Sequence, residues 1–157
     1  MKTILLKERF GIIMWGFIIA IISGALMSMQ GVFNTGVTKQ TNIWLCASFV
    51  QLSALIVCLG AWFITGREGS FIDLYKIDNK YMLLGGAMGA AIPYTVIKSV
   101  DTLGPARANM FIITAQLLVA YIIELMGIFG SERADFEWRK PIGIAIIIIG
   151  IITFKWK

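Results

Sequence analysis

The sequence predicts an all-α integral membrane protein with five transmembrane helices. Of its 157 residues 58% are apolar and only 15% are charged, and the apolar residues form five runs separated by short polar connectors. An ordinary soluble domain has roughly a quarter of its residues charged. The length suits one domain, so we expect residues 1–157 to form a single five-helix transmembrane domain.

The first two runs give the first two helices. Residues 10–30 carry no charge, and about 20 such residues cross a hydrocarbon core about 30 Å thick. Residues 43–65 are also uncharged, and Trp44 and Trp62 stand near the two ends of this run. Tryptophan rings suit the membrane–water interface, so we expect both runs to span the bilayer.

The third run, residues 81–97, is just long enough to span. It lies between Lys80 and Lys98, whose long side chains can extend toward the headgroups. Pro93 frees a backbone carbonyl one turn earlier and can bend the helix, which would leave a hinge or a polar notch beside Tyr94.

The fourth and fifth helices are expected over residues 105–129 and 141–154. Gly104 ends the preceding element, and Pro105 suits a first helical turn because its missing N–H needs no partner there. The fifth run is short, so it requires a thinned bilayer, lysine side chains that reach the surface, or an extra turn before Pro141.

The distribution of lysine and arginine predicts the orientation. Nine of these residues fall on the side of the N-terminus and five on the other side, which places the N-terminus in the cytoplasm and the C-terminus outside. The net charge of +5 therefore reflects topology, and we expect no nucleic-acid partner. The nine are Lys2, Lys7, Arg9, Arg67, Lys76, Lys80, Arg133, Arg139 and Lys140, and the five are Lys39, Lys98, Arg107, Lys155 and Lys157.

A polar stripe follows the first helix. Ser23, Met27, Gln30 and Asn34 stay within about 60° of one another on a helix that continues past Gly31. Unpaired amides are costly in hydrocarbon, so this face should look into the protein or into a wet cavity. Two interpretations remain open, because such amides either line a transport pathway or bind helices together.

The fourth helix carries a second polar face, formed by Asn109, Gln116 and Glu124. Glu124 is the only carboxylate inside a predicted span, and its flanking residues are apolar. Burial would favour its protonated form, as a proton-coupled or cation-binding site requires. The alternative is an interfacial acid near the helix end.

Several chemistries are not expected. Histidine is absent, and Cys46 and Cys58 are separated by twelve residues, or about 18 Å on a helix, so they cannot bridge each other. The spans contain no nucleophile–base pair and no paired carboxylates. We therefore predict neither a metal site, nor a cofactor, nor an enzyme.

Short motifs in a fixed order resemble the YdcZ-like family of the drug/metabolite transporter superfamily. They are Gly24-Ala25-Leu26 with Gln30 and Asn34, Gly85-Gly86 with Gly89, Leu103-Gly104, Gln116, and the acid Glu124 before Gly127-Ile128-Phe129-Gly130. The resemblance implies a bacterial inner-membrane exporter of small molecules and carries functional roles over to Gln30, Asn34, Gln116 and Glu124.

Relatives in that superfamily have ten spans built from two inverted five-span halves, so this chain resembles half of such an architecture. The resemblance then implies an antiparallel dimer in the lipid bilayer, made either of two copies or of this chain and an oppositely oriented relative, that moves its substrate by alternating access. The alternative function is a structural or assembly subunit that transports nothing.

Overall fold

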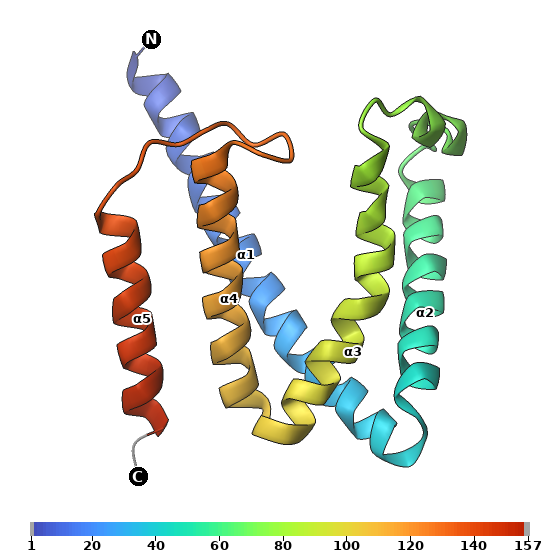
Figure 1. Ribbon diagram of the computed structural model, residues 1–157. Helices are drawn as coiled ribbons and strands as arrows, with labels where there is room; N and C mark the ends of the chain where they lie inside the picture. Colours follow the sequence, from blue (N-terminus) through green and yellow to red (C-terminus); the bar gives the residue numbers. More distant parts are fainter. Residues whose placement is uncertain (1, 156–157) are drawn as a thin grey trace.

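The computed structural model contains five long helices and two short 3-10 helices, and no strand in the part of the chain that it describes (Figure 1). The structure describes residues 2–155 and the side chains of residues 10–154. In chain order the elements are α1 (Lys2–Gln40), α2 (Ile43–Ile64), η1 (Phe71–Lys76), η2 (Lys80–Leu84), α3 (Gly85–Leu103), α4 (Pro105–Met126) and α5 (Arg139–Lys155).

The arrangement confirms the predicted five-helix membrane fold. Four of the described helices are long and apolar enough to cross a membrane, and α5, with 17 residues, is the fifth. The start of α1 and the two longer connections, α2 to α3 and α4 to α5, lie at one end of the bundle (Figure 1). The two short turns and the end of α5 lie at the other end. Lys157, one of the residues used to predict the orientation, lies outside the described residues.

Three helices end three or more residues away from the predicted boundary. α1 continues through Gly31 into polar sequence to Gln40, and α3 continues past Lys98 to Leu103. Gly104, with φ +78, then ends α3, and Gly127, with φ +61, ends α4 three residues before the predicted boundary. Hydropathy locates where a chain enters the headgroups, whereas helices end where the backbone turns.

The fifth helix starts earlier than the apolar run. Arg139 precedes Pro141 by two residues, so α5 gains part of the extra turn that the short run requires. This helix packs against α4. Its attachment to the bundle therefore depends on the α4–α5 contact and on the connection between the two helices.

Helix packing is concentrated near the crossing of α1 and α3 (Figure 1). A Cβ atom added at Gly31 would lie 3.2 Å from Cγ1 of Val96, so the absence of a side chain lets the two helices approach closely. The N-terminal part of α1 is exposed from Phe10 to Met27. Among residues 10–154, whose side chains the structure describes, the buried ones are Gly31, Asn34, Thr35, Cys46, Ala47, Ile97, Val100, Ala108 and Thr114.

Replacing Gly31 by leucine should destabilise the bundle. The new side chain would collide with Val96, and overpacking of this kind costs about 1 to 3 kcal/mol. Gly24→Leu is the matched control, because a Cβ atom at Gly24 meets nothing within 4 Å. Thermal unfolding of the purified variants should show a lower Tm for Gly31→Leu alone. An equal decrease in Tm for both variants would contradict this account of the crossing.

Candidate functional site

A small, mostly apolar cavity with three amide side chains in its lining lies between α1, α3 and α4. Its volume is about 50 Å³. It brings together Gln30 and Asn34 from the stripe on α1 with Asn109 from α4, as the sequence suggested for a shared pathway. The complete lining is Met27, Gln30, Gly31, Asn34, Ile92, Pro93, Val96, Asn109 and Ile112.

The amides of Gln30 and Asn34 are available for a ligand. Asn34 is 8% exposed, and its backbone oxygen accepts a hydrogen bond from the Cys46 thiol at 3.4 Å. Among the described residues, neither the Gln30 nor the Asn34 side chain has a hydrogen-bond partner. Gln30 lies about ten residues, or roughly 15 Å, from the end of α1, well within the span. Unpaired amides at this depth need a polar occupant or a partner helix.

The Asn109 side chain, unlike those of Gln30 and Asn34, forms a hydrogen bond within the chain. Its Nδ2 donates a hydrogen bond to Oγ of Ser28 at 2.9 Å, which ties α4 to α1. The sequence analysis missed Ser28 because its side chain lies off the polar stripe, and only the position of α4 reveals its role. One of the three amides therefore binds helices together while it lines the cavity.

Pro93 and Tyr94 are neighbours in the sequence but have different surroundings in the structure. Pro93 stands inside α3 and lines the cavity, whereas Tyr94 is not part of the lining. The Tyr94 ring stacks on Trp44 of α2, with ring centroids 4.8 Å apart and an interplanar angle of 20°. The predicted polar position beside Pro93 is thus formed by the amides of α1 and not by Tyr94.

Two other predicted residues lie outside this cavity. Ser23 and Gln116 are both exposed, and neither belongs to the lining. A stripe on a helix predicts only the direction in which its side chains point. Ser23 and Gln116 lie at other positions along the axes of α1 and α4 than the residues that line the cavity. Within one copy of the chain, Ser23 and Gln116 face outward.

Glu124 has a partner that the sequence analysis did not identify. Lys140 Nζ lies 2.8 Å from Oε2 of Glu124, and 5.4 Å from the ring centroid of Tyr121. The Glu124 side chain is 49% exposed and belongs to the last turn of α4. The expectation of a purely apolar surrounding is therefore wrong, because the connection to α5 folds back and places an ammonium beside the carboxylate.

An open groove between α1 and α2 leads to the same amides. Its volume is about 520 Å³, and both Gln30 and Asn34 contribute to its lining. Phe33, Phe49 and Val57 form part of its apolar wall. The two amides are therefore accessible from the cavity on one side and from the groove on the other. Such a surface can hold a small solute by hydrogen bonds and apolar contact.

A comparison with protein-family models finds a match to this chain. The model of a family described as "Putative inner membrane exporter, YdcZ" matches residues 15–153, which is nearly the whole chain. No curated protein and no solved structure matches the sequence.

Proposed function

Because the chain belongs to this YdcZ family of inner-membrane exporters, we propose that it exports a small organic solute by alternating access. The chain is a multi-pass inner-membrane protein. The amides of Gln30, Asn34 and Asn109 form the polar part of the pathway in this proposal. The substrate is a small amphipathic or cationic metabolite or drug.

One observation carries the proposal. Gln30 and Asn34 present side-chain amides without a hydrogen-bond partner among the described residues at the meeting point of α1, α3 and α4, where Asn34 is buried and Gln30 is exposed within one copy of the chain. A protein that only needed helix packing could fill these positions with apolar residues at lower cost. Pro93 borders the same point within the continuous helix α3, where it removes one backbone N–H donor from the helix.

An assembly of two halves is supported by the small size of the cavity and by the open groove beside it, which a second unit would cover. At about 50 Å³ the cavity holds little more than one or two water molecules, whereas pockets for organic ligands measure about 300 to 1,000 Å³. A second five-helix unit in the opposite orientation would complete an inverted repeat. The working unit in this proposal is an antiparallel dimer, of two copies or of this chain and an oppositely oriented relative.

Flux measurements test the proposal. The purified chain is reconstituted into liposomes, and the movement of ethidium, a small aromatic cation, and of a mixture of neutral amino acids is followed. We expect solute flux that depends on the protein and decreases in Gln30→Ala. Absence of flux, both for the chain alone and when all five-helix relatives from its source membrane are present, would contradict transport.

The Ser28–Asn109 hydrogen bond is what the alternative function requires. Hydrogen bonds between membrane helices contribute about 0.6 to 2 kcal/mol, and a structural subunit would use its amides only in this way. Ser28→Ala should then loosen the bundle without a specific effect on flux. If Gln30→Ala and Asn34→Ala lower the stability as Ser28→Ala does, and no flux exists, the structural function is favoured.

Labelling from each side tests the antiparallel dimer. Glu132→Cys, in the exposed α4–α5 connection, and Thr41→Cys, in the α1–α2 turn, mark opposite ends of the bundle. With Cys46 and Cys58 replaced by alanine, each marker should react with an impermeant thiol reagent from both faces of the membrane. Reaction from one face only, together with full activity of the chain alone, excludes the antiparallel homodimer. Reaction from one face without activity indicates an oppositely oriented relative.

The remaining predicted pathway residues stay proposals. Ser23, Gln116 and Tyr94 do not reach the cavity of one copy, so they can contribute only through a second unit or another conformation. Glu124 lies near one end of the bundle, where it can exchange its countercharge with a proton or a cationic solute. The orientation with a cytoplasmic N-terminus also stays a prediction.

A further inference from the structure

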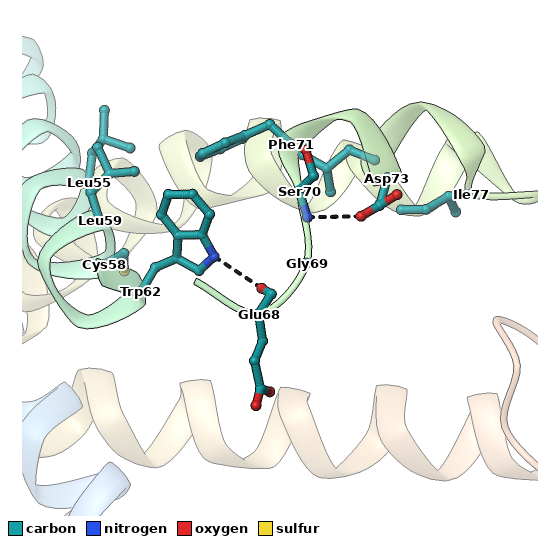
Figure 2. Close-up of a pocket in the computed structure, with 11 residues that line it drawn as sticks. Leu55, Cys58, Leu59, Trp62, Glu68, Gly69, Ser70, Phe71, Asp73 and Ile77 are labelled. Atoms are coloured by element: carbon teal, nitrogen blue, oxygen red, sulfur yellow. Dashed lines mark hydrogen bonds between the residues drawn. The ribbon is translucent and has the colours of Figure 1, made fainter. Parts of the chain in front are cut away.

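An apolar pocket lies between the last turns of α2 and the connection that carries η1. Figure 2 shows it, and its volume is about 470 Å³. It lies at the other end of α2 from Cys46 and shares no residue with the amide cavity, and it borders the open groove between α1 and α2 at Cys58. The lining is Leu55, Cys58, Leu59, Trp62, Glu68, Gly69, Ser70, Phe71, Asp73, Leu74 and Ile77.

The polar groups around this pocket are already used within the connection. The Trp62 indole N–H donates to the backbone oxygen of Glu68 at 3.0 Å. The Ser70 hydroxyl accepts from the Ile72 N–H, and Asp73 Oδ2 accepts from the Ser70 N–H at 2.8 Å. The Glu68 carboxylate points away from Trp62 and Phe71 (Figure 2). An occupant of the pocket therefore meets apolar surface and few free hydrogen-bonding groups, which suits a hydrocarbon chain.

The position of the pocket fits the boundary of the bilayer. α2 is a membrane span that ends at Ile64, so the pocket opens along its last turns. The outer side of η1 also exposes apolar groups, since Ile72 is 66% exposed and Tyr75 is 82% exposed. Such side chains are favourable in the interfacial region, where an amphipathic ring contacts both hydrocarbon and water. The connection therefore lies in the membrane surface.

The charges at the rim are balanced. Lys76 Nζ lies 2.7 Å from Oδ1 of Asp73, which itself lines the pocket. The Lys76 ammonium and then the Ser70 N–H hold the pKa of Asp73 below its ordinary value, so both signs persist at neutral pH. Residues 66–80 contain three basic and three acidic side chains. Sites for anionic lipids instead use clusters of about four to eight basic residues.

We propose that this pocket binds one acyl chain of a zwitterionic phospholipid, whose headgroup lies over the Asp73–Lys76 pair. The phosphate faces the Lys76 ammonium, and the headgroup amine faces the Asp73 carboxylate. The lipid fills the space between α2 and η1 and thereby fixes the connection to the membrane surface. This binding site shares no residue with the amide cavity.

Native mass spectrometry of the full chain tests the proposal. The protein is extracted from bilayers that contain equal amounts of phosphatidylethanolamine and phosphatidylglycerol, and retained lipid is measured. We expect wild type to retain phosphatidylethanolamine. Leu74→Trp fills the pocket from η1 and should lose it, whereas Tyr75→Trp, at the exposed neighbouring residue, should keep it. Cys58→Phe fills the pocket from α2 and should also lose it.

Several results would overturn the proposal. Equal lipid retention in Leu74→Trp and wild type would place the lipid elsewhere, and preferential retention of phosphatidylglycerol would contradict the zwitterionic headgroup. Oxidative cross-linking of Cys58 between chains, with no retained lipid, would show that a second copy covers the pocket. The fluorescence of Trp62 provides a measurement that needs no pocket-filling variant. The Trp62 emission is the difference between the emission of wild type and that of Trp62→Phe, and lipids with brominated acyl chains should quench it. Unquenched Trp62 emission would contradict an acyl chain beside this ring.

Discussion

Gln30→Ala and Asn34→Ala should each reduce transport strongly while the protein remains folded. Both amides lack partners among the described residues, so their removal breaks no hydrogen bond within the chain. The substrate, however, loses the hydrogen bond that it would form with the amide. A lost hydrogen bond in a desolvated site costs about 1 to 3 kcal/mol, which is roughly a 5- to 150-fold loss in affinity. Initial rates of solute flux in proteoliposomes, measured over a range of substrate concentrations, check this expectation.

Met29→Ala is the matched control for these variants. Met29 neighbours Gln30 on α1 but is 49% exposed and does not line the cavity. Its replacement should leave flux, yield and dimerisation unchanged. If Gln30→Ala and Asn34→Ala instead abolish dimerisation in detergent, the amides serve helix association and the pathway lies elsewhere.

Glu124→Gln should abolish the pH dependence of transport. In the proposed mechanism the Glu124 carboxylate exchanges Lys140 for a proton or a cationic solute, so the two ligands compete for one group. Glutamine keeps the size and can still form hydrogen bonds, but it cannot bind or release a proton. Uptake driven by a pH gradient, compared between wild type and variant, measures the effect.

Lys140→Gln separates coupling from stability. Both partners of the ion pair are partly exposed, and ion pairs that solvent reaches contribute little to stability, so neither variant should unfold the chain. Lys140→Gln should keep pH-dependent transport, because the proposed exchanging group, the Glu124 carboxylate, remains. A Glu124→Gln variant with undiminished and equally pH-sensitive transport would mean that Glu124 is only an interfacial residue.

The fold was predictable because the bilayer imposes simple rules on the sequence. Five apolar runs require five helices, since no other structure satisfies the backbone of an isolated span in hydrocarbon. Gly104 and Pro105 also located a real boundary between α3 and α4. The ends of α1 and α3 were less predictable, because polar residues such as Lys98 leave the hydrocarbon without ending the helix.

For the candidate site, the sequence predicted only the helix faces on which the polar residues lie. The helical period placed Gln30 and Asn34 on one face of α1, and Asn109 on a polar face of α4, and these three residues share the cavity. The same period also predicted Ser23 and Gln116 as pathway residues, although neither lines the cavity. The helical period predicts the angle at which a side chain points from the helix axis. Whether that side chain contacts another helix also depends on the tilt of both helices and on their relative position along the bundle.

The class of protein, the number of spans and the polar faces can be derived from the sequence alone, because they follow from hydropathy and from a fixed rotation per residue. Which polar groups meet depends on how the helices pack. Ser28 pairs with Asn109 because α1 and α4 cross at that height, and Lys140 reaches Glu124 because a connection folds back. The crossing itself depends on Gly31, where the missing side chain lets α3 approach α1. Such meetings depend on distances between elements far apart in the chain, and no local pattern encodes them.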